Sequence, residues 1–208
     1  MLVYEGVKSG FINDVDLNLI TDKILTRFKE VFHRSTGESE INSWRESMLR
    51  MRGVLADNEI PNNAGVAIEF NIPHTSNRID FLLSGYDKNK NNSIIIIELK
   101  QWTHADAVPG KDGVVSTITG KALREVTHPS YQAWSYAAYI EDFNENVQRD
   151  NVKLLPCAYL HNYENVEPKT ILSDKYKGYI EKAPVFISGD ALKLREFIKK
   201  YVTEGDDK

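Results

Sequence analysis

Four consecutive isoleucines at positions 94–97 constrain the fold of this chain more than any other segment. The turn-forming segment 87–92 precedes them, and Glu98-Leu99-Lys100 follows them directly. An apolar segment of β-branched residues without polar alternation is typical of a strand that is buried on both faces. We therefore expect residues 93–102 to form a central strand of a sheet that is flanked by helices.

Two further segments of strand character, residues 65–72 and 78–85, precede this strand. The segments that separate the three, residues 73–77 and 87–92, are rich in proline, serine, asparagine and aspartate, which favour turns. Three strands joined by short turns predict an antiparallel meander. The sequence pattern predicts two more strands, at residues 152–160 and 183–187.

Apolar residues recur at helical spacing in several other segments. These are residues 14–32, the segment from Ser39 to about residue 56, residues 130–143 and the segment after Asp190. The order of helices and strands indicates one mixed α/β domain over residues 1–203, followed by a polar tail at 204–208. A chain of 208 residues suits a single domain of this kind.

Composition excludes several classes of protein. The formal net charge of −4 argues against a protein that binds nucleic acid by bulk charge, so any such role needs a local site. The single cysteine, Cys157, excludes a disulfide framework and a four-thiolate zinc site. No apolar run approaches the roughly 20 residues of a membrane span, and residues 1–5 show no secretory signal. We expect a cytoplasmic protein with no membrane partner.

Charged residues at the end of the isoleucine strand indicate a chemical site. Glu98 and Lys100 project from the same face of the strand, where charges are rare unless they are paired, bind a metal or take part in chemistry. Asp80 lies in the preceding strand, and the meander can bring it beside Glu98. Two carboxylates suit Mg²⁺, the Leu99 carbonyl is a further candidate ligand, and Lys100 can hold a phosphate or orient water. This set predicts metal-dependent phosphodiester hydrolysis.

Asp80 followed by Glu98-Leu99-Lys100 at the end of an apolar strand resembles the PD-(D/E)XK nuclease superfamily. The resemblance implies a restriction-endonuclease-like mixed sheet and a nuclease that depends on Mg²⁺ or Mn²⁺. It assigns catalysis to Asp80, Glu98 and Lys100, with both carboxylates as metal ligands. The proline of the superfamily name is missing, since Ile79 precedes Asp80.

The helix expected after this strand carries Gln132 and Tyr136, which are similar to the Q-x-x-x-Y element of RecB-like superfamily members. This similarity implies that Gln132 acts beside the catalytic residues and that Tyr136, together with the lysine of the motif, contacts nucleic acid. Many members add an acidic residue from a helix before the meander. Glu40 is our first choice for this ligand and Glu46 the second, and Glu69, on the first strand of the meander, is a third.

A wider resemblance is to the nuclease-like domain that precedes a helicase or ATPase in some bacterial proteins. It rests on Ser39-Glu40 with Trp44, Arg78-Ile79-Asp80, Glu98-Leu99-Lys100-Gln101-Trp102 and His128-Pro129-Ser130-Tyr131-Gln132. It implies DNA as the substrate, with RNA not excluded, and a C-terminal ATPase partner in repair or phage defence. Residues 204–208 would then begin a linker. Gly120-Lys121-Ala122 lacks the spacing and the hydroxyl of a phosphate-binding loop, so the ATPase is not in this segment.

Other interpretations remain open at this point. The charges of Asp80 and Lys100 can form a purely structural ion pair. A nuclease-like domain can also bind DNA or a partner domain without turnover, or cleave only when an ATPase is attached.

The long connection at residues 103–127 is a separate feature. It is polar, contains Gly110, Gly113 and Gly120, and has one short segment of strand character at 114–118. Connections of this length are usually functional or mobile. We expect it to form a flap over the cleft.

Overall fold

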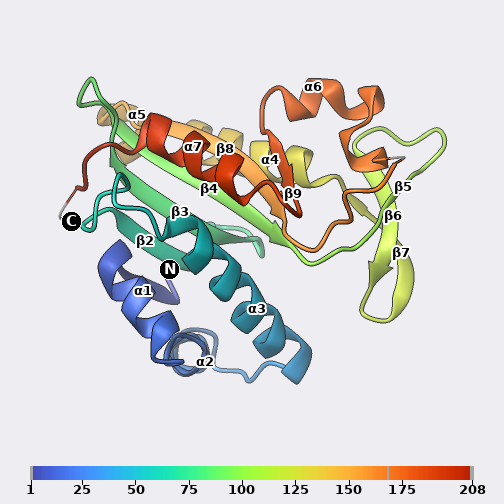
Figure 1. The fold of residues 1–208 in the computed structure, drawn as a ribbon. Helices are drawn as coiled ribbons and strands as arrows, with labels where there is room; N and C mark the ends of the chain where they lie inside the picture. Colours follow the sequence, from blue (N-terminus) through green and yellow to red (C-terminus); the bar gives the residue numbers. More distant parts are fainter. Residues whose placement is uncertain (1, 168, 207–208) are drawn as a thin grey trace.

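The computed structural model describes residues 2–167 and 169–206 and contains two sheets (Figure 1). The larger sheet has six strands in the order β1-β2-β3-β4-β8-β9, and the smaller one has three in the order β5-β6-β7. The strands are Tyr4–Val7 (β1), Gly65–Asn71 (β2), Arg78–Tyr86 (β3), Asn92–Lys100 (β4), Asp106–Ala107 (β5), Val114–Thr119 (β6), Ala122–Thr127 (β7), Lys153–Leu160 (β8) and Val185–Ile187 (β9).

Helices cover both faces of the larger sheet, as Figure 1 shows. They are Lys8–Asp16 (α1), Ile20–Phe32 (α2), Glu38–Leu55 (α3), Pro129–Phe143 (α4), Glu145–Arg149 (α5), Lys177–Ile180 (α6) and Ala191–Tyr201 (α7). The main core joins one face of the sheet to α1, α2, α3 and α7. The opposite face packs against α4 and α5. The chain is therefore an α/β protein with a mixed sheet between helices.

Strand β4 is central, as the isoleucines predict. It pairs antiparallel with β3 and parallel with β8. Ile95 and Ile97 belong to the main core, whereas Ile96 packs on the α4 side, and all three are fully buried. The meander β2-β3-β4 and the later strand β8 are confirmed, and α4 crosses between β4 and β8.

The segment predicted as one helix over residues 14–32 contains two helices. The chain breaks after α1 at residues 17–19, where Asn18 has a φ of +58°. Leu17 and Leu19 continue the apolar periodicity but are exposed in the structure. Strand β1 was not expected, because four residues at a sheet edge give little periodic signal.

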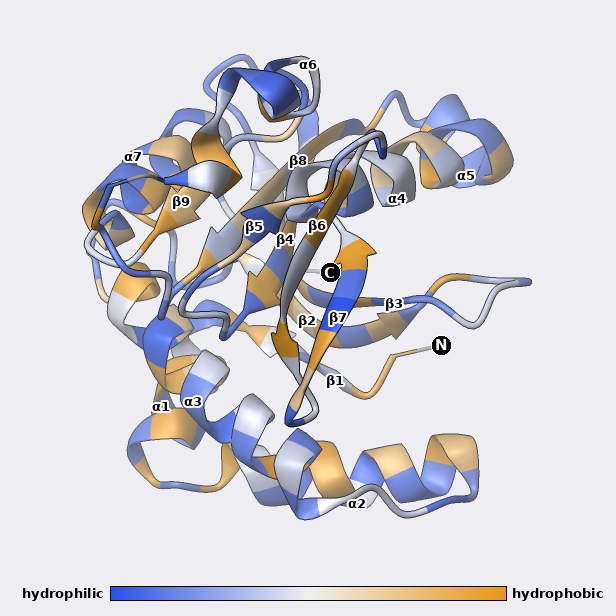
Figure 2. Ribbon diagram, turned by 90° about the vertical axis from the view of Figure 1, so that its right-hand side faces the viewer, coloured by the Kyte–Doolittle hydropathy of each residue, from blue (hydrophilic) through white to orange (hydrophobic). Residues whose placement is uncertain are grey.

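The connection at residues 103–127 forms the smaller sheet. Strand β6 corresponds to the expected short strand, whereas β5 and β7 were not expected. Val115 is fully buried in a cluster that includes Tyr163 and Tyr176, so the base of this sheet is packed against the body of the domain. Figure 2 shows the β6–β7 hairpin extending from this base toward the level of α3.

The folded part continues past residue 203. The Tyr86 amide donates a hydrogen bond of 2.8 Å to the Glu204 carbonyl, which forms an isolated bridge at the end of β3. The expected tail is thus anchored at its first residue, and its last two residues, 207–208, lie outside the described part. No helix within residues 2–167 and 169–206 is long and apolar enough to cross a membrane.

Candidate active site

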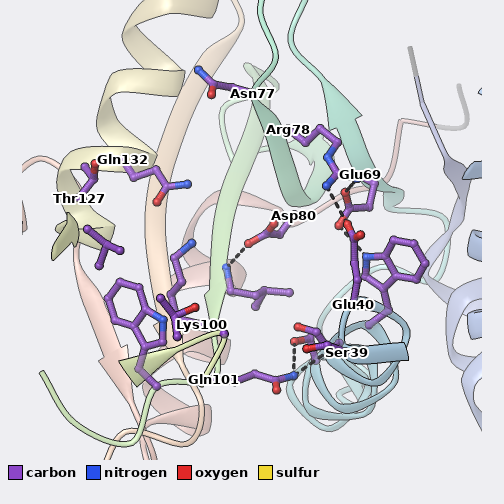
Figure 3. A pocket seen from close by; sticks show the side chains of 18 of the residues that line it. Ser39, Glu40, Glu69, Asn77, Arg78, Asp80, Lys100, Gln101, Thr127 and Gln132 are labelled. Carbon is purple, nitrogen blue, oxygen red and sulfur yellow. Dashed lines mark hydrogen bonds and ion pairs between the residues drawn. The ribbon is translucent and has the colours of Figure 1, made fainter. Parts of the chain in front are cut away.

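The site lies where β3 and β4 separate. Their ladder runs from Tyr86 opposite Asn92 to Phe81 opposite Ile97. Just beyond this last pair, the Leu99 amide of β4 donates a hydrogen bond of 2.8 Å to the side-chain carboxylate of Asp80 in β3 rather than to a strand carbonyl (Figure 3). Strand β4 continues to pair with β8 as far as Lys100. The separation opens the sheet at the position of the charged residues.

Glu98 is the buried centre of this site, with 1% of its surface exposed. Its Oε1 accepts hydrogen bonds from Lys100 Nζ at 2.5 Å and from Gln132 Nε2 at 2.8 Å. The same Gln132 nitrogen lies 2.9 Å from the Tyr136 hydroxyl. The second carboxylate oxygen, Oε2, is buried and has no hydrogen-bond partner. A buried carboxyl oxygen without a partner is costly and needs an explanation.

Helix α4 places Gln132 and Tyr136 over the charged end of β4. The helix begins at Pro129, where proline is favoured, and the His128 side chain accepts a hydrogen bond from the Ser130 amide at the helix start. Positions 132 and 136 are one turn apart on the same face. The structure therefore brings both predicted residues to the site.

The charges of the site shift one another's pKa values. Burial is the largest cause that raises the pKa of Glu98, and the negative charge of Asp80 is the second. The ammonium of Lys100 lowers this pKa, but the net result is a pKa of about 8. Burial lowers the pKa of Lys100, but Glu98 and Asp80 outweigh it, so the net pKa is raised and the ammonium is retained. A carboxyl with a raised pKa beside a charged lysine is typical of functional sites.

The raised pKa of Glu98 predicts a pH dependence of stability. The folded chain keeps the Glu98 proton, which the unfolded chain releases near the ordinary pKa of 4.5, so the contribution of Glu98 to metal-free stability falls as pH rises from about 5 to about 8. We expect Glu98→Gln to gain stability relative to the wild-type chain as pH rises over this range in thermal melts with chelator. Glu141→Gln, an exposed change on α4, is the control. An unchanged slope in Glu98→Gln would contradict the assignment.

A second charged group borders the first. Arg78 Nη2 donates a hydrogen bond of 2.7 Å to Glu40, and its Nη1 forms an ion pair of 2.9 Å with Glu69 without hydrogen-bond alignment. Trp44 Nε1 donates to the other oxygen of Glu69 at 2.8 Å. Burial, followed by the charge of Asp80, raises the pKa of Glu69 to about 7 while Arg78 opposes the shift. Figure 3 shows this group beside Asp80.

The three candidates for an additional acidic ligand have different positions. Glu40 and Glu69 line the same cleft as Asp80, but both are bound to the guanidinium of Arg78. Glu46 is exposed and is not part of the cleft lining. The structure thus brings two of the three carboxylates to the cleft, each already paired with a cation.

Glu69 also has an unusual backbone. Its φ is +55°, a left-handed value that is costly for a residue other than glycine. Ile68 packs into the main core, whereas Phe70 packs on the α4 side, so the strand alternation inverts at this residue. Strained residues of this kind gather at functional sites.

The charged residues open into a cleft of about 850 Å³. Its lining comes from α3, β2, β3, β4, α4 and the β6–β7 hairpin. Gln101 at its floor donates a hydrogen bond of 3.0 Å to the Ser43 carbonyl and so joins the end of β4 to α3. Trp102 and Tyr131 add aromatic surface. The sequence interpretation gave no role to Arg78 or Gln101, although each lies within two residues of a predicted catalytic residue.

The donor set fits a hard divalent cation. Asp80 and Glu98 supply carboxylate oxygens, Leu99 lies between them in the cleft lining, and Glu98 Oε2 needs a partner. Across the described ranges, no three His, Cys, Asp or Glu side chains are arranged to hold a metal. Mg²⁺ needs only one or two carboxylates, because it keeps several waters.

Comparison with known proteins gives no assignment: no family model, no curated protein and no solved structure matches this chain. Two carboxylates that can hold a cation lie beside an ammonium that can hold an anion; Asp80 and Lys100 line the open cleft, and Glu98 is buried behind them. This combination suits reactions at phosphate groups.

Proposed function

We propose that this chain is a metal-dependent nuclease domain of the PD-(D/E)XK type, which hydrolyses phosphodiester bonds of DNA. The observation that carries the proposal is buried Glu98, whose Oε2 lacks a partner, next to Lys100 and Asp80, which line a cleft. The succession α3-β2-β3-β4-α4-β8, with its mixed sheet, supports a restriction-endonuclease-like core.

Asp80 and Glu98 are the side chains that would hold Mg²⁺ or Mn²⁺, with the Leu99 carbonyl as a further oxygen donor. When bound, the ion lowers the pKa of a water molecule and offsets charge that develops on the phosphate. Lys100 keeps its ammonium next to these carboxylates, where it can donate hydrogen bonds to a phosphate oxygen or to the attacking water.

Gln132 and Tyr136 support this centre from α4. Gln132 donates to Glu98 Oε1, which fixes the carboxylate and leaves Oε2 directed elsewhere. Because the Tyr136 oxygen accepts from Gln132, its own proton is available to a phosphate oxygen of the substrate. The two residues therefore have a positioning role and a substrate-binding role.

A structural ion pair explains the site less well. A buried pair adds little stability even when all its atoms are satisfied. Here one carboxylate oxygen remains unsatisfied and the pKa of Glu98 is raised, so burial of this group costs stability. Such a cost is understandable where the group binds a ligand.

We also propose that the domain works as one module of a cytoplasmic helicase or ATPase. The net charge of −4 gives it little general attraction for DNA, so a partner that holds the DNA would complement it. Cys157 is a free, buried thiol, as is usual in a reducing compartment.

Cleavage of labelled single-stranded and duplex DNA tests this function, with RNA as a parallel substrate. We expect products with Mg²⁺ or Mn²⁺, none with chelator and none from Asp80→Asn. Asp142→Asn, an exposed change on α4, is the matched control and should cleave normally. Cleavage by Asp80→Asn at the wild-type rate would contradict the proposal. Metal binding that needs Asp80 without any cleavage would favour the silent, DNA-binding alternative.

A further inference from the structure

The β6–β7 hairpin has a firm base and a narrow tip. Thr119 pairs with Ala122 across a two-residue turn, in which Gly120 and Lys121 have φ values of +59° and +65°. Positive φ at both positions gives the tight type of hairpin turn, which matches the twist of its strands. At the base, the Thr117 hydroxyl donates a hydrogen bond of 2.6 Å to the His104 carbonyl. The tip is thus held at a defined place beside the cleft.

An exposed apolar pair lies next to this tip. Ile118 and Leu123 are directly opposite each other, and 72% and 70% of their surfaces are exposed. Residues directly opposite on antiparallel strands lie on the same face, so the two form one apolar surface. Ile118 also lines the cleft. Isoleucine and leucine are among the side chains that proteins insert between base steps of DNA.

The charges around the pair favour a nucleic acid over an apolar protein partner. Lys121 at the turn and Arg124 in β7 take part in none of the ion pairs formed by the described residues. The third nearby cation, Lys111, is paired with Glu125 near the hairpin base. By strand alternation Arg124 projects from the face opposite Leu123, so one of these two cations lies at the turn and the other behind the apolar surface, where they can attract phosphate groups.

The cleft floor behind the hairpin suits unpaired bases. Trp102 and Tyr131 line it, and Lys100 Nζ lies 5.7 Å from the centre of the Trp102 ring. Bases of a single strand stack on aromatic side chains irrespective of sequence. A strand that passes the hairpin would therefore meet stacking surfaces and then Lys100.

We propose that the β6–β7 hairpin is a wedge that separates the strands at the end or fork of a duplex. Ile118 and Leu123 pack against the last base pair, Lys121 and Arg124 hold the phosphates beside it, and one unpaired strand enters the cleft. This inference rests on the proposed function and names its substrate: the single strand of a forked or frayed DNA end.

A binding experiment without turnover tests the wedge directly. In the Asp80→Asn background, we expect forked DNA with 2-aminopurine in its last base pair to become brighter on binding, because that base loses its stacking. Adding Ile118→Ser and Leu123→Ser should reduce this increase at least about fivefold and leave affinity for single-stranded DNA within about twofold. Leu192→Ser is the control, since this exposed leucine of α7 is not part of the cleft lining.

The outcomes separate the wedge from the nuclease. An equal fluorescence increase with the Ile118→Ser/Leu123→Ser chain, or none with the parent chain, overturns the wedge. In the active chain, the two substitutions should slow cleavage of blunt duplex about tenfold more than they slow cleavage of single strands. Equal loss on both substrates also overturns the wedge, in favour of a general binding surface. Failure of the wild-type chain to cleave any substrate counts against the nuclease, while the fluorescence result still decides the wedge.

Discussion

Replacing Lys100 with alanine is expected to slow metal-dependent DNA cleavage by about 10²–10³-fold while the chain remains folded. The ammonium lies at the cleft floor, bound to Glu98 and close to Asp80, where a scissile phosphate would develop charge. Its loss does not leave a buried anion, because Glu98 already has a raised pKa and takes up a proton when the ammonium is gone. Single-turnover cleavage rates and thermal melts measure the two effects separately.

Two further lysine variants make this result interpretable. Lys100→Met keeps the length of the side chain and removes only its charge, so it should lose activity to the same extent. Lys177→Ala changes an exposed lysine of α6 that does not line the cleft, and it should cleave normally. Wild-type cleavage by Lys100→Ala or Lys100→Met would remove this lysine from the mechanism.

The meander could be predicted because its signals are local. The isoleucines at 94–97, the alternation in 78–85 and the turn residues between them each specify strand or turn within a few positions. The split between α1 and α2 has no such signal. Leu17 and Leu19 continue the helical periodicity, and the break depends on the left-handed backbone of Asn18, which asparagine tolerates without requiring it.

The β6–β7 hairpin was predicted in part. Its cleft-lining position agrees with the expected flap, but β7 was not expected, because most of its residues are exposed and show no apolar alternation. The sequence did contain one signal for a hairpin: Gly120-Lys121, a possible two-residue turn, lies between β-branched residues and Ala122. Whether the segment moves as a flap stays a prediction.

The charged centre could be predicted from strand alternation and helix spacing. Asp80, Glu98 and Lys100 meet because β3 and β4 are adjacent strands, and Gln132 follows on the next helix. The role of the additional carboxylates could not be predicted in this way. The ion pairs of Arg78 with α3 and β2 depend on how that helix packs against the sheet, and this tertiary contact leaves no periodic signal in the sequence.

Arg78→Ala is expected to lower the free energy of unfolding by about 3 kcal/mol. The Arg78 side chain is 23% exposed and is bound to both Glu40 and Glu69, so its loss leaves two acids beside Asp80 without their cation, and the pKa of Glu69 rises further. It also removes the contact with the Phe28 ring, whose centre lies 5.2 Å from the guanidinium carbon. Urea unfolding at neutral pH measures the change.

The surface pair of Arg52 with Asp16 provides the matched control, because loss of an exposed ion pair should change the free energy of unfolding far less. Adding Glu69→Gln to Arg78→Ala removes one of the unpaired charges and should restore part of the stability. A loss with Arg78→Ala no larger than that with Arg52→Ala would contradict the view that Arg78 neutralises the two acids.

The same variants test which acid would serve the proposed metal ion. Without Arg78 the pKa of Glu69 rises further, so above that pKa its carboxylate lies beside Asp80 without a cation and offers a divalent ion a further ligand. Binding of Mg²⁺ to the folded state adds to stability. In urea unfolding we therefore expect Mg²⁺ to stabilise Arg78→Ala more than the wild-type chain. We expect it to stabilise Arg78→Ala/Glu69→Gln less than Arg78→Ala. Equal stabilisation of both variants would exclude Glu69. Repeating the comparison with Glu40→Gln then decides whether the carboxylate of α3 takes this role, as the sequence first indicated.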